Sequence, residues 1–483
     1  MKRGVLSKVA GLGALTAAGQ LLVVGTLPLY SRTFDPAAYG EYIVFVGAYA
    51  IVSVFAGLRY DSAIVLPRSQ GMAQALSLLV VALGLLVAAL IALATPGLVI
   101  ASSASPATKG AELNLGYGLA VATVLGALQR CLTSWCIRRS RFLSMGWAQF
   151  LFSLITVIAQ LSLVRLIPQL PALVWGYVGA LLGQLLWLAA AVPGAFTRSR
   201  PSWRALRVVA RKYRRFPRYM VGYALASSVR DRLIQLAFGL GAGAAVLGRF
   251  GLAYRVMFAP NSLIYSAVSP VFYSLASRGR PEAVGRFAAD LVEASFVALV
   301  TPYVALAIEA PALTEVTLSA KWHGTGPYLQ ALAAPALMLA VTCWLDRAFD
   351  SFRRQKIAFV LEASFTAVSV ALVAVLSLCI DPVAVVWAFG ALALVYYWVY
   401  ALGVFVSCGF RLADLRRAMA QGLLSLSIAL VLALLVHRIA HPEIRLLSYL
   451  GLMGAVLAAW VRLQGGADII MRLARSRAAS DST

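Results

Sequence analysis

The sequence is poor in the residues that build catalytic and metal sites. It has three histidines, five cysteines and 18 acidic residues among 483. No two cysteines form a Cys-x-x-Cys pair, and His323, His437 and His441 lack metal-ligand spacing. The chain also lacks a glycine-rich phosphate loop with Lys-Ser or Lys-Thr, and any nucleophile motif with partner residues. These absences argue against a metal, a cofactor and an enzymatic function.

Apolar residues dominate what is present. The chain is 61% hydrophobic and 12% charged, with a mean hydropathy of +0.84, which is typical of an integral membrane protein. The net charge of +24 could suggest nucleic acid, but the basic residues fall in short gaps between apolar blocks. We therefore expect anionic lipid headgroups, and no nucleic acid, as the partner of this charge.

The apolar blocks are about twenty residues long, which is the length of a helix that crosses a bilayer. They predict an all-α protein of about 14 transmembrane helices, with twelve and a wrongly scored pair as the alternative. The expected spans are 6–29, 39–58, 72–94, 113–136, 145–166, 173–195, 219–240, 250–273, 286–307, 327–349, 357–379, 383–406, 420–436 and 446–461.

The basic residues predict the topology. Nine of them and no acid lie between Thr197 and Tyr219, and a loop of this kind normally stays in the cytoplasm. Most other Lys and Arg residues fall in alternate gaps on the same side. We therefore expect a multi-pass protein of the cell inner membrane with both termini cytoplasmic. The predicted domains are a six-helix lobe over 1–196, a basic hinge loop over 197–218, a second lobe over 219–410, and two additional helices with a tail over 411–483.

A short motif occurs near the start of each predicted lobe. Ala37-Ala38-Tyr39-Gly40-Glu41-Tyr42 and Ala244-Ala245-Val246-Leu247-Gly248-Arg249-Phe250 both read as small residues, an apolar residue, then glycine and an aromatic ring. Six predicted helices separate the two motifs, so the repeats would have the same orientation in the membrane. The sequence thus predicts two pseudo-symmetric lobes.

Several stretches resemble bacterial polysaccharide flippases, the O-antigen and exopolysaccharide translocases of the multidrug/oligosaccharidyl-lipid/polysaccharide exporter superfamily. They sample the first 360 residues in the family's order, whereas the last two spans show no such similarity. The matching features are Pro28 with Ser31-Arg32, Pro36 with Tyr39-Gly40-Glu41-Tyr42, Leu58-Arg59-Tyr60-Asp61 leading to Pro67, Tyr213-Arg214-Arg215-Phe216-Pro217, Arg255 with Pro260, and Lys321-Trp322 with Gly326-Pro327-Tyr328.

This resemblance implies two six-helix lobes around a central cavity, here with two extra helices, and alternating access. It also implies that the substrate is an undecaprenyl-diphosphate-linked oligosaccharide, moved from the cytoplasmic to the periplasmic leaflet. A polysaccharide polymerase and a chain-length regulator become candidate partners. Coupling to a proton gradient, a sodium gradient or the membrane potential stays open.

Charges within spans are the candidate functional residues, because each costs several kcal/mol unless it is paired or faces water. Near the middle of the seventh span, one stripe at i, i+3, i+4 and i+7 carries Ser228, Asp231, Arg232 and Gln235, while Arg230 points away from it. The stripe predicts either cavity lining or an Arg–Asp pair that locks this helix to a neighbour.

The eighth span carries a similar polar face of Arg255, Ser262 and Ser266, continued by Ser269 and Tyr273, with Pro260 between them. A kink at Pro260 would open carbonyl groups toward a cavity. The alternative is close packing of small polar residues against another helix.

In the first lobe, Arg130 lies about 12 Å from the basic boundary at Arg138, within reach of either a cavity or the membrane surface. Arg59 and Asp61 end the second span, where an ion pair and a substrate contact are equally expected. Gln20, four residues after Thr16, could line the same cleft or join two helices.

Two acidic groups favour structural roles. Asp346, Arg347 and Asp350 predict an interfacial salt-bridge network at the end of the tenth span. Asp290 and Glu293 are expected in the first turns of the ninth span, where a helix N-terminus favours carboxylates, with cation coupling as the alternative.

The sign of the buried charge selects among substrates. Four arginines within spans, Arg130, Arg230, Arg232 and Arg255, face one clear mid-membrane acid, Asp231. Guanidinium groups bind phosphate oxygens in pairs, which suits a diphosphate headgroup. The sequence therefore favours a flippase for lipid-linked repeat units. A lipid II flippase, a multidrug or cation antiporter, and a membrane scaffold for polysaccharide enzymes are the alternatives.

Overall fold

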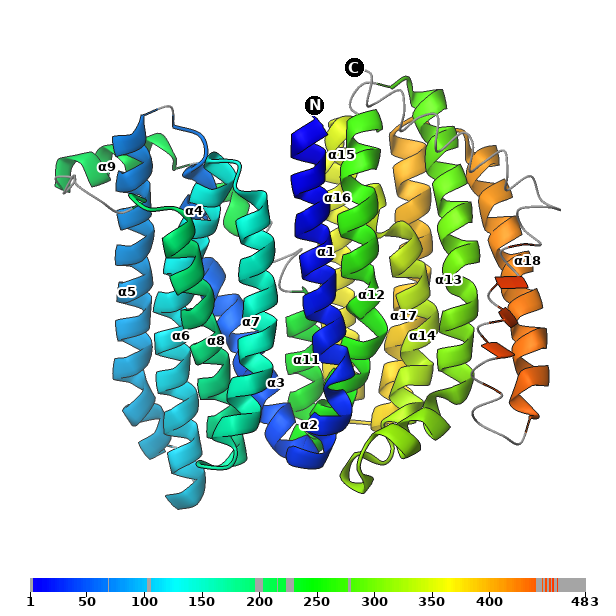
Figure 1. Ribbon diagram of the computed structural model, residues 1–483, viewed down its shortest axis with the longest axis horizontal. Helices are drawn as coiled ribbons and strands as arrows, with labels where there is room; N and C mark the ends of the chain where they lie inside the picture. Colours follow the sequence, from blue (N-terminus) through cyan, green and yellow to red (C-terminus); the bar gives the residue numbers. More distant parts are fainter. Residues whose placement is uncertain are drawn as a thin grey trace. The chain divides into compact units, whose positions relative to one another are not determined.

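The computed structural model describes residues 3–67, 69–101, 106–195, 203–214, 216–222, 230–276 and 279–439, with isolated positions between 445 and 458. Every regular element among them is a helix (Figure 1). The chain forms two compact units, here called the N-terminal unit, Gly4–Gly248, and the C-terminal unit, which is Arg249–Thr483 with the first three residues.

The N-terminal unit is a bundle of long helices joined by short turns. Its elements are α1 (Arg3–Gly25), α2 (Leu27–Thr33), α3 (Pro36–Gly57), α4 (Tyr60–Ala63), α5 (Gln70–Ala101), α6 (Pro106–Arg138), α7 (Phe142–Leu163), α8 (Gln169–Ala191), α9 (Trp203–Lys212), a π-helix (Phe216–Met220) and α11 (Arg230–Ala242). Helix α11, which comes last in the chain, packs along α3.

The C-terminal unit continues from α12 and has longer helices. Its elements are α12 (Ala244–Ala276), α13 (Pro281–Thr317), a 3-10 helix (Ala320–Trp322), α14 (Gly326–Thr342), a second 3-10 helix (Cys343–Leu345), α15 (Asp346–Ser351), α16 (Gln355–Leu376), α17 (Pro382–Ser407) and α18 (Leu412–His437). Helix α13 packs against both α14 and α18.

The described residues include ten helices that are long and apolar enough to cross a membrane, and the bent pair α1–α2 makes an eleventh. The prediction of an all-α integral membrane protein is therefore confirmed. The count of 14 and the division into lobes at 197–218 stay predictions. The last expected span, 446–461, lies largely outside the described residues.

Several predicted boundaries were wrong. The first span is not continuous, because α1 and α2 meet at a bend of 40° around Thr26. Pro28, in the first turn of α2, lacks the N–H that would continue the α1 hydrogen bonds. The expected gap at 95–112 is mostly helical, since α5 continues through Pro96 to Ala101. Without access to water, a backbone keeps most of its hydrogen bonds by staying helical, although the proline removes one of them.

The hinge stretch was also expected to be a loop, yet it contains α9 and the π-helix. Helix α9 packs on α5, where Val209 is fully buried in the core that surrounds Trp135. We call this end of the N-terminal unit, where α5 begins and α6 ends, the hinge end. Helix α9 is therefore a folded part of the unit, because its apolar face has a core to cover.

The two glycine motifs lie against each other in the N-terminal unit. A Cβ on Gly40 would sit 1.8 Å from the Ala244 carbonyl oxygen, and one on Gly248 would sit 2.0 Å from the Pro36 carbonyl oxygen. Only glycine allows both backbones to approach this closely. Two similar motifs thus form one reciprocal contact between the first turns of α3 and α12.

Candidate functional site

A left-handed turn brings two charged residues into the core of the N-terminal unit. After α3 ends at Gly57, Leu58 and Arg59 both have positive φ, 44° and 59°, and α4 begins at the next residue. This conformation costs roughly 1–2 kcal/mol per non-glycine residue, so the surrounding structure must hold it. It leaves Asp61 only 6% exposed, whereas the sequence placed this residue near the membrane surface.

Arg130 of α6 reaches the same turn. A Cβ placed on Gly57 would lie 3.3 Å from Asp61 Oδ1 and 3.9 Å from Arg130 Nη2, so glycine leaves room for both groups. Arg59 Nε, Arg130 Nε, Arg130 Nη2 and Asp61 Oδ1 are buried and have no hydrogen-bond partner among the described residues. Buried polar atoms are normally satisfied, so these atoms have unmet hydrogen-bonding capacity within the unit.

Tyrosines extend the site from Arg130. The charge of the Arg130 guanidinium acts on the Tyr49 hydroxyl. The Tyr49 ring lies 5.7 Å from that of Tyr177 in an edge-on arrangement, and the charges of Arg130 and Arg232 both act on the Tyr177 hydroxyl. Tyr49 and Tyr177 lie deep in the unit but keep part of their surface accessible. They therefore link two arginines from α6 and α11.

Gly126 of α6 makes the approach of Tyr49 to Arg130 possible. A Cβ at this position would lie 2.1 Å from the Tyr49 hydroxyl oxygen. Tyr49, Tyr177 and Gly126 were not predicted from the sequence, because aromatic rings and glycines within apolar spans usually serve only for packing. The one available signal was the spacing of Gly126 and Arg130, one helical turn apart.

On α11 the predicted stripe is rearranged by local pairing. Arg230, whose side chain is 11% exposed, pairs through Nε with Asp231 Oδ1 at 3.2 Å, while Asp231 is 45% exposed. Arg232 Nη1 donates to Gln235 Oε1 at 2.9 Å, and Gln235 is buried. Asp231 therefore neutralises Arg230 rather than Arg232. Ser228 lies outside the described residues.

The candidates on α12 belong largely to the C-terminal unit. Arg255 is half-buried there, and Ser262 donates to the Ala259 carbonyl of its own helix at 3.0 Å. The side chain of Ser266 is not among those that the structure describes. Helix α12 continues through Pro260. In the N-terminal unit, Gln20 is half-buried on α1, and Thr16 donates to the Leu12 carbonyl.

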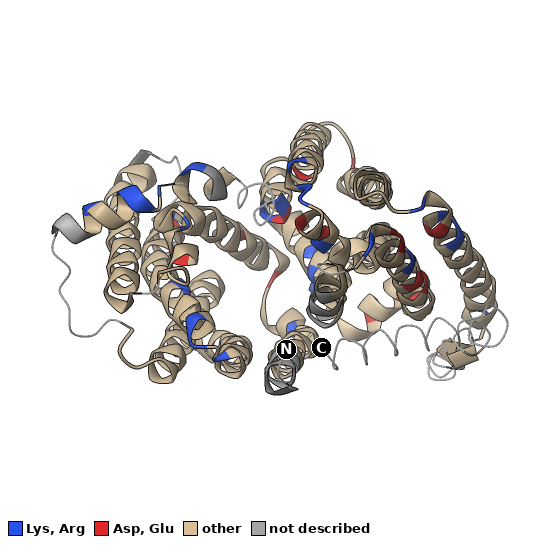
Figure 2. Ribbon diagram, turned by 90° about the horizontal axis from the view of Figure 1, so that it is seen from above, with Lys and Arg blue, Asp and Glu red and all other residues tan. Residues whose placement is uncertain are grey.

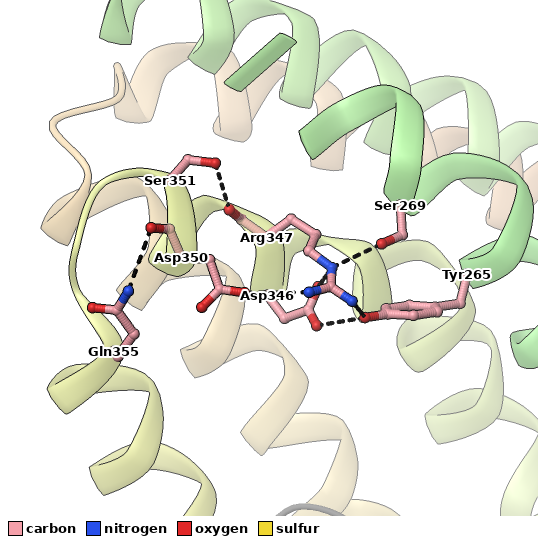
Figure 3. A network of polar contacts seen from close by, with 7 residues as sticks. All are labelled: Tyr265, Ser269, Asp346, Arg347, Asp350, Ser351 and Gln355. Carbon is pink, nitrogen blue, oxygen red and sulfur yellow. Dashed lines mark hydrogen bonds and ion pairs between the residues drawn. The ribbon is translucent and has the colours of Figure 1, made fainter. Parts of the chain in front are cut away.

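The network predicted at the end of the tenth span is confirmed, and it also joins α12 (Figure 3). Arg347 pairs with Asp346 at 3.9 Å and Asp350 at 3.3 Å. Its Nε donates to Ser269 Oγ at 2.9 Å and its Nη2 to the Tyr265 hydroxyl. Because Arg347 is shared among these partners, the network fixes α12 to α15.

The helix N-terminus proposed for Asp290 and Glu293 was wrong. Helix α13 begins at Pro281, so both acids lie beyond its first turns, and they are only 3% and 1% exposed. Arg417 of α18 supplies their counter-charge, with Nη2 at 2.6 Å from Asp290 and Nε at 3.8 Å from Glu293. A structural ion pair therefore accounts for these carboxylates.

The comparisons with known proteins agree with this architecture. The family model described as polysaccharide biosynthesis protein matches residues 29–327. Comparison with curated protein sequences gives no significant match.

Two solved structures have similar folds. A structure named lipid II flippase MurJ, in an inward closed conformation, is 13% identical with a TM-score of 0.72, covering 93% of this chain and 98% of its own. An inward-facing multidrug resistance MATE family transporter of the MOP superfamily is 12% identical with a TM-score of 0.58, covering 85% of this chain and 94% of its own. At these identities the likeness is one of fold.

Proposed function

Because the chain belongs to the family of polysaccharide biosynthesis proteins, we propose that it is a flippase for undecaprenyl-diphosphate-linked oligosaccharides in polysaccharide biosynthesis. The substrate would move from the cytoplasmic to the periplasmic leaflet of the inner membrane by alternating access. The observation that carries this proposal is the cluster of unsatisfied arginine nitrogens at Arg59 and Arg130 within an apolar membrane unit. Uncompensated guanidinium groups at this depth are costly unless they serve a ligand.

Each group in the N-terminal unit has a role in this proposal. Arg130 and Arg59 bind phosphate oxygens of the diphosphate, and Arg232 contributes charge from α11. Guanidinium forks suit this task because they hold two oxygens at once. Tyr49 lies beside Arg130 and supplies a polar hydroxyl next to its charge. The substrate contact of Arg255 on α12 stays a prediction from the sequence, and the polyprenyl tail stays in lipid.

Asp61 would lower the affinity of the proposed site and so favour release of the substrate. This buried carboxylate lies beside Arg130 at the Gly57 turn, so it competes with an incoming phosphate for the same positive charge. A translocator must bind its cargo weakly enough to let it leave. The net charge around the turn, from Arg59, Arg130 and Asp61, is one positive unit, which attracts a diphosphate without trapping it.

The multidrug antiporter is disfavoured by the charge of the site. A cavity for cationic compounds requires carboxylates, whereas the unsatisfied nitrogens at Arg59 and Arg130 belong to cations. A lipid II flippase is the second candidate. The observation in its favour is that the likeness to the MurJ structure covers 93% of this chain, whereas the family model ends at residue 327.

Mass spectrometry of lipids that co-purify with the full-length protein tests the proposal. We expect a polyprenyl-diphosphate oligosaccharide from the parent, and about tenfold less from Arg130→Ala with Arg232→Ala, as for the loss of about 1.4 kcal/mol of binding free energy. Arg139→Ala is the control, because Arg139 is a half-buried arginine whose Nη1 donates to the Pro193 carbonyl. The headgroup mass separates lipid II from another oligosaccharide. Equal diphosphate lipid in the parent and the double variant would contradict the proposed site.

A further inference from the structure

Helix α9 presents a row of cations that the candidate site does not use. At 100° per residue, Arg207 and Arg211 fall on one stripe at i and i+4, and Arg214 follows in the turn directly after the helix. All three side chains are exposed. Within the described part of the chain, no carboxylate lies within ion-pair distance of these three, and the sequence from 197 to 219 contains no acid. Figure 2 shows Lys and Arg along this helix.

The helix is held firmly, so the stripe has a fixed direction. Its opposite face packs into the core of the N-terminal unit through the buried Val209, with Leu206 and Tyr213 against the same core. Lys212 Nζ lies 3.8 Å from Met72 Sδ, in the first turn of α5. Since α5 is a candidate membrane span, α9 lies at the beginning of that span.

The position of α9 at one end of a candidate span distinguishes it from a solvated basic loop. Val208 is 61% exposed on the flank of the stripe, which places an apolar side chain beside the arginines at the level where a span ends. Exposed apolar and basic groups on one amphipathic helix are the combination that binds an anionic membrane surface. A soluble protein partner would not explain the position at the end of α5.

A hydrogen bond connects α9 to the turn that carries the candidate site. The Tyr60 hydroxyl donates to the Ala210 carbonyl of α9 at 3.2 Å, and Tyr60 lies between Arg59 and Asp61 in the chain. Burial raises the pKa of Tyr60, so its hydroxyl stays protonated and can donate at physiological pH. This hydrogen bond therefore links the position of α9 directly to that of α4.

We propose that the Arg207–Arg211 stripe together with Arg214 is an accessory site for anionic phospholipid headgroups of the adjacent leaflet. Bound lipid adds to the core packing that holds α9, and through Tyr60 it further orders the turn that presents Arg59 and Asp61. The chain would then respond to the charge of the membrane around it. This site is separate from the proposed diphosphate site, since its cations lie on the surface of the hinge end.

Hydrogen–deuterium exchange of the full-length protein in nanodiscs tests both steps. The nanodiscs contain phosphatidylcholine alone or with phosphatidylglycerol. We expect the anionic lipid to slow exchange several-fold in residues 203–214, which reports occupancy, and in residues 58–64, which reports coupling. The variant with Arg207→Gln, Arg211→Gln and Arg214→Gln should lose both effects. Unchanged protection in this variant would overturn the proposal.

Two further variants separate the steps. Arg353→Gln, Arg354→Gln and Lys356→Gln remove three exposed cations of the C-terminal unit, and this matched variant should keep both effects. If it loses them as well, the response reflects net charge and the site is refuted. Tyr60→Phe should keep protection of 203–214 and lose that of 58–64. Full protection of 58–64 in Tyr60→Phe would refute the coupling.

A soluble anion provides the last test of the proposal. In phosphatidylcholine nanodiscs, inorganic pyrophosphate should not protect 203–214, because the proposal assigns the stripe to lipid headgroups at a surface. Protection by pyrophosphate equal to that by phosphatidylglycerol would refute the lipid assignment. None of these measurements involves transport, so their failure is distinguishable from failure of the proposed flippase function.

Discussion

Two arginines of α6 illustrate how differently one residue type is used. The Arg138 side chain binds backbone, since its Nη1 donates to the carbonyls of Ile64, Val65 and Pro67. Arg130, eight residues earlier, keeps two buried nitrogens without partners. Hydrogen bonds to charged groups contribute about 1.5–3 kcal/mol, whereas an unsatisfied buried group costs a comparable amount. Arg138 therefore contributes to stability through these bonds, whereas two nitrogens of Arg130 do not.

Substituting these two arginines should give opposite results. Arg130→Ala removes unsatisfied charge, so we expect a melting temperature equal to or above the parent's, with transport reduced at least tenfold. Arg138→Ala leaves three carbonyl groups without their donor and should destabilise the protein by about 2 kcal/mol. A detergent melting curve beside polymer export in cells measures both. Strong destabilisation by Arg130→Ala would show that Arg130 is structural.

Gly126 tests whether the placement of Tyr49 matters. Gly126→Ala puts a methyl group where the Tyr49 hydroxyl now lies, and we expect destabilisation of about 1–3 kcal/mol from overpacking. Tyr49→Phe in the same chain removes the clashing oxygen and should recover part of this loss. The double-mutant cycle is measured by thermal unfolding. Strictly additive effects of the two substitutions would contradict the contact.

At the scale of elements, α18 is an integral part of the C-terminal unit. Besides Arg417 near its start, its last residue, His437, lies 2.8 Å from Glu309 of α13. Between these points Gly422 is so close to α13 that a Cβ would sit 2.8 Å from the Phe296 ring. Helix α18, which lies beyond the family match at residues 29–327, is thus tied to α13 at both ends and packed tightly along it.

Arg417→Ala should therefore be severe. It removes the Arg417 charge that pairs with the buried Asp290 and Glu293, and the loss of one member of a buried ion pair costs about 3 kcal/mol or more. Adding Asp290→Asn and Glu293→Gln removes the stranded charge and should restore most of the thermal stability. Arg416→Ala, at the exposed neighbouring position, is the control. A mild effect of Arg417→Ala would indicate that the carboxylates have other compensation.

For the whole molecule, membrane orientation is the property that the proposed direction of transport depends on. The basic gaps predict that the turn after α15 is cytoplasmic and that the turn before α14 is periplasmic. In each turn an exposed polar residue, Gln355 and His323 respectively, accepts substitution without loss of core packing. These two positions therefore report the orientation.

In a variant without native cysteines, His323→Cys should react with a membrane-impermeant thiol reagent in intact cells. Gln355→Cys should react only after the cells are permeabilised, because the basic gaps predict that this position is cytoplasmic. Labelling is followed by a gel shift, with permeabilised cells as the positive control for both positions. The reverse pattern would invert the proposed topology and the direction of transport with it.

The sequence by itself determined the membrane class and much of the helical framework. Apolar blocks of about twenty residues can satisfy their backbone in lipid only as helices or closed barrels, and their length gives the spans. Charges within spans stood out because each is expensive there, so Arg130, Arg230 and Arg232 were recognisable from their positions. The ion pairs of Arg347 followed from the spacing of Asp346 and Asp350 along one helix.

Tertiary structure decided which of these charges meet and which are compensated. The left-handed turn at Leu58–Arg59 buries Asp61, and non-glycine residues give no local signal for such a turn. Arg417 reaches Asp290 across 127 positions of sequence. The roles of Tyr49 and Gly126 depend on how closely α3 approaches α6. Contacts of this kind arise from the packing of whole helices, which periodicity along one chain segment does not encode.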